Sequence, residues 1–300
     1  VVYTKNWLED ASRRDFTINA IYSDIDGNLF DPFNGKKDLY DGSIEFIGDP
    51  AIRLKEDYLR ILRYIRFFLK YSKSEHEINI IKSINKNING ISKISSSRLL
   101  DEFKKIIESA GLIKLNSNQF SHETIKLVFP QFKNLNNLKK INSSLFPKLE
   151  KIDFVFLLSM LVIDETDNSE YFIYKFNISK KEQKRILNLK KFFFSNDKII
   201  KFDEKNLWKI LYLYGKETLM DILNYKIFTL KKIDNNLERY IQFFRNKEAP
   251  ILPINGEQLI KKFNIPEGKE VGKNLKLIES MWLNNNFQIS EDQVKKLLQN

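Results

Sequence analysis

Apolar side chains recur at the spacing of an amphipathic helix from about Asp49 to the C-terminus, and this pattern limits the possible folds more than any other feature. Residues three and four positions apart lie on one side of a helix, so such a series predicts a helix with one buried face. The first series consists of Leu54, Tyr58, Leu59, Ile61, Leu62, Ile65, Phe68 and Leu69. Later series lie near residues 150–163, 181–194, 205–214, 217–232 and 235–245. We therefore expect a predominantly helical fold beyond residue 49.

The first fifty residues differ from the rest, because they indicate a mixed α/β fold. Two short apolar stretches, residues 20–23 and 29–31, flank Asp26-Gly27, a dipeptide typical of a tight hairpin turn. Residues 43–47 predict another short strand.

Polar composition predicts a loop at residues 83–97, between two helices. Residues 98–109 predict a further helix, capped by one of the serines at 95–97 and ended by Gly111. Prolines cluster between residues 250 and 266, and we expect a new unit to begin near residue 249.

Charge is unevenly distributed along the chain. The 300 residues carry a net charge of +11, yet residues 1–70 carry −1 and the remainder +12. A basic region suits a polyanionic partner, most simply a nucleic acid. A lysine-rich solvated surface would have the same composition, so charge alone leaves both interpretations open.

The longest uncharged apolar run, Phe154–Ile163, is too short to cross a membrane, which requires about 20 residues. It predicts a buried helix, and no membrane partner is expected. The chain contains no cysteine. This excludes disulfides, a thiol nucleophile and cysteine-ligated metals, and it agrees with the reducing cytoplasm.

The first polar motif, residues 13–19, has the sequence Arg-Arg-Asp-Phe-Thr-Ile-Asn. Its two guanidinium groups, carboxylate and carboxamide are costly to bury without partners. Arginines suit a triphosphate, whereas the Asp and Asn side chains suit the hydroxyl groups of a ribose. The alternative is a cluster of charged residues on the surface.

The second polar motif is Glu56-Asp57-Tyr58-Leu59-Arg60, followed by Arg63 and Arg66. In a continuous helix Asp57 and Arg60 share a face, because they lie one turn apart. Each step of three residues falls about 60° short of a full turn, so Arg63 lies beside the pair and Arg66 faces elsewhere. Asp57 and Arg60 can therefore meet one small planar target. The alternative is an ion pair on an exposed helix, which contributes only about 0.3–0.5 kcal/mol.

The chemistry of an Asp–Arg pair suits two of the four nucleobases. A carboxylate accepts a hydrogen bond from an exocyclic amino group, and a guanidinium donates to ring acceptors. Cytosine and adenine both place an amino group beside a ring nitrogen, whereas uracil and guanine present a carbonyl oxygen there. The pair can thus accept CTP and ATP and reject UTP and GTP. Such rejection is strong when it leaves buried polar groups unpaired.

In this order the two motifs resemble those of class II CCA-adding enzymes and bacterial poly(A) polymerases, a branch of the polymerase-beta-like nucleotidyltransferases. The resemblance covers residues 7–70 closely and resumes at 97–102, and residues 253–282 resemble the C-terminal segment of CCA-adding enzymes more than that of poly(A) polymerases. It implies an α+β remnant of a nucleotidyltransferase head followed by a predominantly α-helical neck, body and tail, and so a mostly α protein. The implied boundaries are 1–52 for the head, 53–110 for the neck, 111–248 for the body and 249–300 for a tRNA-binding tail.

The resemblance also implies roles for single residues. The implied nucleotide-binding residues are Arg14, Asp15, Asn19, Asp57, Arg60, Arg63 and Arg66. Asp15 and Asn19 would lie near the sugar, and the Asp57–Arg60 pair would read the base. The implied partners are tRNA, CTP and ATP, and no protein partner is evident.

The carboxylates that bind two Mg²⁺ ions in this family, and its phosphate-binding loop, precede the first motif and have no counterpart here. The chain begins at Val1 without a methionine. We therefore expect a fragment, inactive by itself, of an enzyme whose Mg²⁺ ligands lie upstream of residue 1. The catalytic residues stay unknown. Asp24-Ile25-Asp26 has the letters of the metal pair, but its position beside Gly27 favours a turn.

Three functions stay open at this stage. They are a CCA-adding tRNA nucleotidyltransferase, a template-independent poly(A) polymerase of the same family, and a non-catalytic RNA-binding fragment. An enzyme that adds only CC or only A is a variant of the first. His76 and His122 lack a second ligand at metal spacing, so we expect surface or packed histidines. Phe192–Phe194, Tyr212 and Tyr214 could stack on bases, but core packing is favoured.

Overall fold

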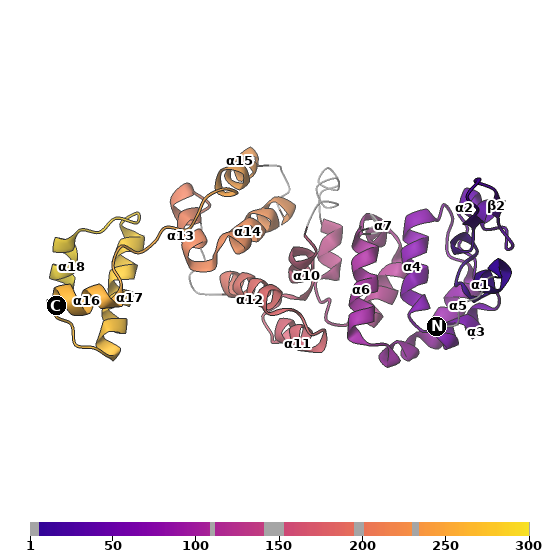
Figure 1. Ribbon diagram of the computed structural model, residues 1–300, viewed down its shortest axis with the longest axis horizontal. Coiled ribbons are helices and arrows are strands. Elements are labelled where there is room, and N and C mark those ends of the chain that lie inside the picture. The colour runs from indigo at the N-terminus through magenta and orange to yellow at the C-terminus, as the bar shows by residue number, and fades with distance from the viewer. Residues whose placement is uncertain (1–5, 109–111, 141–152, 195–200, 230–233, 300) are drawn as a thin grey trace. The chain divides into compact units, whose positions relative to one another are not determined.

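The computed structural model describes residues 6–108, 112–140, 153–194, 201–229 and 234–299. In these residues the protein is mainly helical and has one two-stranded sheet (Figure 1), which confirms the expected α+β, mostly α fold. The chain separates into two compact units, residues 1–187 and 188–300, and the boundary falls inside helix α12 (Lys180–Phe194). The predicted division into head, neck, body and tail stays a prediction. The single boundary between the two units, at residues 187 and 188, does not test it.

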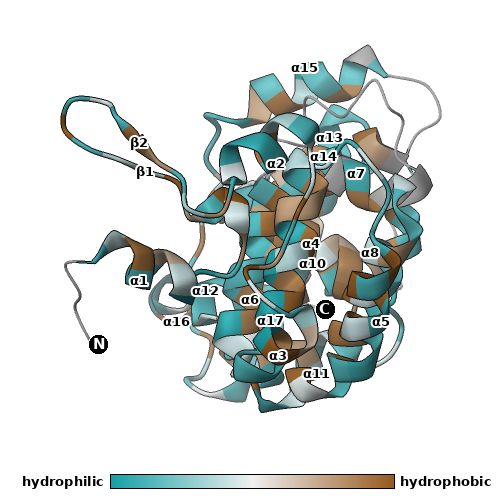
Figure 2. Cartoon of the chain, turned by 90° about the vertical axis from the view of Figure 1, so that its right-hand side faces the viewer, coloured by the Kyte–Doolittle hydropathy of each residue, from teal (hydrophilic) through white to brown (hydrophobic). Residues whose placement is uncertain are grey.

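The first unit opens with short elements that carry the first motif. They are α1 (Trp7–Arg13), the 3-10 helix η1 (Thr17–Asn19), strands β1 (Tyr22–Ser23) and β2 (Leu29–Phe30), and α2 (Gly35–Asp41). The strands pair antiparallel, with Tyr22 opposite Phe30. Figure 2 shows the tip of this hairpin standing clear of the helices. The carboxylate of Asp24 accepts hydrogen bonds from the backbone N–H groups of Asp26 and Asn28 at 2.9 and 2.8 Å, which confirms the predicted turn.

The strand predicted at residues 43–47 is wrong. Only Phe46 pairs, in an isolated antiparallel bridge with Phe16, because the chain turns into η1 directly after Phe16 and cannot extend the ladder. Backbone N–H groups of Thr17 and Ile47 donate to the carbonyl groups of Glu45 and Asp15 at 3.1 and 3.0 Å. This short pairing fixes the backbone on both sides of Phe16, whose ring is fully buried.

The next elements are α3 (Pro50–Glu56), α4 (Arg60–Tyr71), α5 (Ile78–Asn87), the 3-10 helix η2 (Ile88–Lys93) and α6 (Ser96–Ile106). Helix α3 packs against α5, and α4 packs against α6. The loop predicted at residues 83–97 is wrong: α5 and η2 occupy most of it, because Ile84 and Ile91 are buried in the core. Helix α6 confirms the predicted helix, but it begins at Ser96, and the side chain of Ser95, its N-cap residue, makes no capping hydrogen bond, so the predicted serine cap is wrong. Gly111 lies outside the described residues.

A helical prediction is also corrected, in the region of Asp57. The apolar series from residue 54 onward predicted one continuous helix, but α3 ends at Glu56 and α4 begins at Arg60. Asp57 follows α3 with extended dihedral angles, φ −153° and ψ 106°. The backbone N–H of Arg60 donates to the carbonyl oxygen of Asp57 at 3.0 Å, which closes a tight turn. Asp57 therefore stands outside the helix that carries the arginines.

The remainder of the first unit comprises α7 (Leu112–Ser117), α8 (Gln119–Val128), the 3-10 helix η4 (Leu135–Lys140), α10 (Phe154–Val162) and α11 (Asn168–Lys175). Helix α10 confirms the predicted buried helix, and the Asp153 carboxylate caps it by accepting from the N–H groups of Val155 and Phe156 at 2.9 and 3.1 Å. No helix among the described residues is both long and apolar enough to span a membrane. A chain of stacked or tilted rings contributes to the core here, from Phe103, Phe129, Phe132, Phe172 and Phe176.

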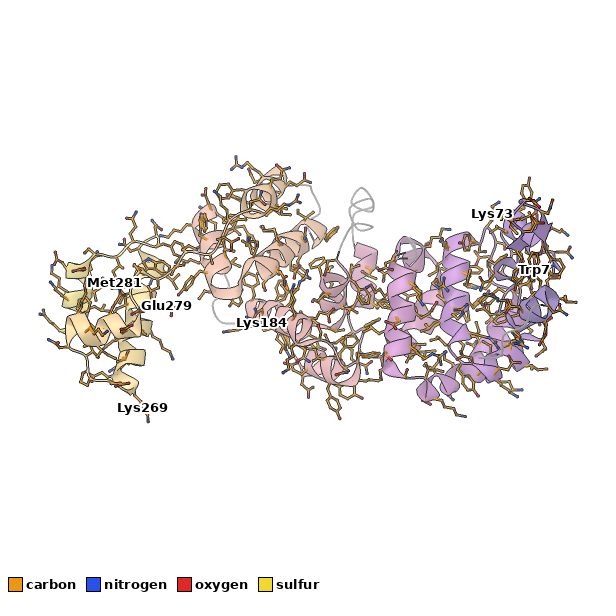
Figure 3. The ribbon with its side chains drawn as sticks, in the orientation of Figure 1. Trp7, Lys73, Lys184, Lys269, Glu279 and Met281 are labelled. Carbon is orange, nitrogen blue, oxygen red and sulfur yellow. The ribbon has the colours of Figure 1, made fainter. Side chains whose placement is uncertain are left out.

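The second unit contains α13 (Glu204–Tyr214), α14 (Lys216–Thr229), α15 (Asn235–Phe244), α16 (Gly256–Phe263), α17 (Lys269–Asn284) and α18 (Glu291–Leu298). Helices α12 to α15 confirm the later apolar series. The last three helices share a small core of Leu259, Ile278 and Val294. The Tyr212 hydroxyl donates to Glu279 at 2.6 Å, and its ring packs edge-on against Trp282, so it serves packing as expected. Figure 3 labels Glu279 and Met281 on α17.

Candidate nucleotide-binding site

Asp15, in the first motif, is buried and holds two other candidate residues. Its carboxylate accepts a hydrogen bond from Nε of Arg63 and another from the Asn19 amide at 3.1 Å. The side chain of Asp15 is only 4% exposed, compared with 29% for Arg63. Burial by itself would raise the pKa of Asp15, but the hydrogen bond and charge of Arg63, helped by Asn19, outweigh it and lower the pKa below its ordinary value. Asp15 is therefore an ionised anchor that orients Arg63 and Asn19.

Arg14 pairs with a different carboxylate. Its guanidinium donates to Asp10 through Nε and Nη2, at 3.2 and 2.9 Å, and lies 5.9 Å from the centre of the Tyr22 ring. The Tyr22 hydroxyl donates to the same Asp10 oxygen at 2.6 Å. The Arg14 side chain is 44% exposed, so it can exchange its carboxylate partner for a phosphate at modest cost.

Asp57 and Arg60 do not bond to each other through their side chains. Asp57 accepts from the backbone N–H of Leu59 at 3.1 Å and from Arg98 Nη2 at 2.7 Å. Arg60 uses Nη1 for the carbonyl oxygen of Arg53 at 2.6 Å and for the Glu56 carboxylate. A carboxylate has about four acceptor positions and a guanidinium five donors, so both groups keep hydrogen-bonding capacity for a further planar partner.

The three arginines of α4 reach three different elements, in agreement with the winding that their spacing predicts. Arg60 bonds to Glu56 of α3, Arg63 to Asp15 of the first motif, and Arg66 to Glu102 of α6. Glu102 is almost fully buried, at 2% side-chain exposure, and also lies 3.4 Å from Lys105. Helix α4 is thus held on three sides by ion pairs. Asp15, Asn19 and Arg63 are brought together, whereas Arg66 is turned toward α6.

The turn between Asp57 and Arg60 is also fixed by close packing. A Cβ atom added to Gly90 of η2 would lie 2.1 Å from the ring of Tyr58, so only glycine allows this ring to lie against η2. A Cβ atom added to Gly35 would similarly lie 2.1 Å from the carbonyl oxygen of Thr17, in the first motif. Each motif therefore packs against a glycine, and the missing Cβ atom allows the close contact.

The remaining candidates take structural places, except Phe194, which is 44% exposed. His76 is packed between the Phe68 ring and the Tyr64 hydroxyl, which lies 2.9 Å from its Nδ1, and His122 is buried as well. The Phe192 ring packs edge-on against Tyr214. Among the described residues, no group of three or more His, Asp or Glu side chains could hold a metal ion, and Asp24 serves the hairpin turn.

Sequence reasoning missed the residues that hold the site in place. Arg53, Arg98 and Glu102 bond respectively to the first motif, to Asp57 and to Arg66. Arg98 and Glu102 lie one helical turn apart in the stretch 97–102, whose resemblance to the family was noted without a role. Their position on one side of a predicted helix was the available signal, but their partners lie far away in the sequence.

Two family profiles match the chain. The one described as "tRNA nucleotidyltransferase domain 2 putative" matches residues 148–297, which is half of the chain, and the one described as "Poly A polymerase head domain" matches residues 1–45. The chain is 28% identical to the human protein "CCA tRNA nucleotidyltransferase 1, mitochondrial" over 299 residues, which cover 98% of this chain and 67% of that protein. It is 29% identical to the CCA-adding enzyme of Lactobacillus helveticus over 306 residues, covering 100% of this chain and 73% of that enzyme.

A solved structure of similar fold is the Bacillus stearothermophilus CCA-adding enzyme in complex with CTP. The TM-score is 0.72 at 20% identity, and the match covers 99% of this chain and 75% of that one. At this identity the likeness establishes the fold, while the profile match over half of the sequence establishes the family. The chain therefore belongs to the tRNA nucleotidyltransferases, in the class II branch of the CCA-adding enzymes.

Proposed function

We propose that the intact protein adds C, C and A to the 3′ end of tRNA without a nucleic-acid template, using CTP and ATP. The observation that carries this proposal is the turn at Asp57–Arg60. An acceptor and a donor with spare hydrogen-bonding capacity stand at its two ends, and each is held by residues of other elements. Preorganised groups of this kind discriminate well, because they do not relax around a wrong base.

The other candidate residues fit the parts of a nucleotide that all bases share. Arg14, exposed and bound to a replaceable carboxylate, would meet the triphosphate. Asn19 would meet the sugar, while Asp15 fixes the positions of Asn19 and Arg63. We further propose that Arg66 supports the site through Glu102. In this scheme the shared part of the nucleotide binds to the first motif, and the base is read at the second.

Membership of this family implies dependence on a divalent metal ion, and we propose Mg²⁺ for the intact enzyme. The described carboxylates do not fit a two-metal site: Asp24 is engaged in its turn, and Asp15 is buried against Arg63. No chemical step is therefore assigned to the residues of this chain. Their part is to bind and select the nucleotide.

The proposed RNA partner agrees with the charge of the chain. The net charge of +12 beyond residue 70 suits a polyanion such as tRNA. We propose that the helical region, with the helices α16 to α18 as its tail, holds the tRNA. A cytoplasmic site of action agrees with the absence of cysteine.

Poly(A) polymerase activity is the second candidate, because the head profile carries that description. The profile over residues 148–297 favours tRNA instead. The products distinguish the two: a CCA-adding enzyme extends tRNA by C, C and A and then stops, whereas a poly(A) polymerase adds an open run of A.

The base-reading proposal is tested with Asp57→Ala and Arg60→Ala in the full-length protein. We expect discrimination of CTP and ATP against UTP and GTP to fall by roughly 100-fold or more, because the wrong bases would no longer face a fixed acceptor and donor that they cannot pair with. Lys104→Ala is the matched control, since Lys104 belongs to an exposed ion pair on α6 with Glu108 at 3.8 Å. Unchanged discrimination in the Asp57 and Arg60 variants would refute the assignment.

A further inference from the structure

Arg53 on α3 lies between the two halves of the proposed site and contacts both. Its Nη2 donates to the carbonyl oxygen of Arg13 at 3.0 Å and to that of Arg14. Its Nη1 donates to Glu56 at 2.7 Å. Its own carbonyl oxygen accepts from Arg60 Nη1 at 2.6 Å. One residue thus links the backbone of the first motif to the arginine of the second.

The carbonyl groups that Arg53 binds belong to the end of α1 and to the residue after it. Arg13 is the last residue of α1, and Arg14 follows with extended dihedral angles, φ −67° and ψ 161°. The last carbonyl groups of a helix lack partners within the helix, and a guanidinium is a favourable donor to them. By holding two successive carbonyl groups, Arg53 sets the direction in which the chain leaves α1. That direction decides where the side chains of Arg14 and Asp15 lie.

The Arg53 side chain is well placed to hold this geometry firmly. It is only 12% exposed, so water competes weakly for its hydrogen bonds. Two bonds from one planar group to two carbonyl oxygens restrict rotation as well as distance. Its Nε is buried without a hydrogen-bond partner among the described residues. Nε of Arg53 thus forms no hydrogen bond, while Nη2 keeps its two bonds to the carbonyl oxygens of residues 13 and 14.

We propose that Arg53 is a positioning residue that sets the sugar and triphosphate contacts of the nucleotide through the backbone of Arg13 and Arg14, without itself reading the base. The proposal rests on the function proposed above. The side chain of Arg53 holds the backbone of the first motif and donates to Glu56, but its only direct contact with Arg60 is through its backbone carbonyl oxygen. Without that side chain, Arg60 keeps its own bonds to Glu56 and to this carbonyl oxygen. Replacing the side chain should therefore weaken the contacts to the sugar and triphosphate, which CTP and ATP share, and leave the recognition of the base intact.

The test is equilibrium binding of CTP and of ATP to the full-length protein, alongside the rate of nucleotide addition to tRNA. For Arg53→Met we expect the dissociation constants of CTP and ATP to rise together by about 10- to 100-fold, as the loss of one hydrogen bond to a charged group produces. Discrimination against UTP should stay as in the wild-type protein. Arg53→Lys, which keeps the charge and a donor, should restore part of the affinity for both nucleotides. Lys55→Met, which removes an exposed charge from the same helix, is the control and should bind as the wild type does.

Several outcomes would overturn the proposal. A lower melting temperature with unchanged nucleotide affinity would assign Arg53 a purely structural role. A rise in the dissociation constant of only one nucleotide, or a gain of UTP binding, would place Arg53 in base reading. If Arg53→Met does not fold, Arg53→Lys decides, and wild-type affinity for both nucleotides in that variant would refute the proposal that the guanidinium of Arg53 sets these contacts. Failure of the wild-type protein to extend tRNA would refute the proposed function, yet the CTP and ATP affinities would still test Arg53.

Discussion

Removing Arg63 tests whether Asp15 is a buried anchor, because Arg63→Met leaves that carboxylate without its counter-charge. Loss of one partner of a buried ion pair costs about 3–5 kcal/mol, whereas loss of an exposed pair costs about 0–1 kcal/mol. Asp15 is 4% exposed and would keep two weaker donors, the Asn19 amide at 3.1 Å and the Phe16 N–H at 3.2 Å. Arg63 is not fully desolvated either, at 29% exposure. We therefore expect the low end, about 3 kcal/mol.

Urea and thermal unfolding measure this loss. A loss of about 3 kcal/mol lowers the melting temperature of a unit of this size by roughly 6–12 °C. Lys104→Met, which breaks the exposed pair with Glu108, should cost less than about 1 kcal/mol. The double variant Asp15→Asn with Arg63→Met should be less destabilised than the sum of the two single changes, because it removes the uncompensated charge.

The pH dependence supplies an independent check with a definite sign. In the wild-type protein the pKa of Asp15 lies below its ordinary value of 3.8, so the pair contributes stability above that pH and loses it as the pH falls. Without Arg63, burial would raise the pKa of Asp15, and the destabilised variant would gain from protonation as the pH falls. The difference between the two proteins should therefore shrink from pH 7 to pH 4. A loss below about 1 kcal/mol, or a difference that does not change with pH, would refute the anchor.

Two further predictions concern the second motif and the RNA. Gly90→Ala forces the Tyr58 ring away from η2, where the added Cβ would lie 2.1 Å from a ring carbon, so we expect a loss of about 1–3 kcal/mol in unfolding and weaker discrimination against UTP. If Gly90→Ala is destabilised but discriminates against UTP as the wild type does, the packing of Tyr58 against η2 does not contribute to base reading. The affinity for tRNA should fall steeply with salt, by about 10³-fold or more between 50 and 200 mM if six or more phosphate contacts form, and a flat salt response in filter binding would contradict a basic RNA-binding surface.

Helices and turns in this protein were largely predictable, because their determinants are local. Asp153 caps α10 two and three residues ahead, and Asp24 closes the hairpin within four residues. The apolar series after residue 150 marked α10 and α12 to α15. The kinds of side chain in the site were predictable, because several guanidinium and carboxylate groups within two short motifs suit a nucleotide.

Where local signals conflicted with packing, packing decided. Residues 83–97 are polar in composition, yet Ile84 and Ile91 draw them into helical turns against the core. The series from Leu54 onward ran unbroken, yet the extended conformation of Asp57 separates α3 from α4. Neither choice could be made within the segment itself, because both depend on elements that the segment contacts.

The sequence by itself determined which chemical groups this protein presents and that Arg60, Arg63 and Arg66 stand on one helix. Only the tertiary structure decided which charged side chains form ion pairs with each other. Arg63 finds Asp15 at a distance of 48 residues along the chain, Asp57 finds Arg98 at 41, and Arg66 finds Glu102 at 36. Pairs within one helix follow from its spacing of three and four residues. Pairs as distant as these follow only from how the helices pack, and the packing is set by the apolar faces of the helices.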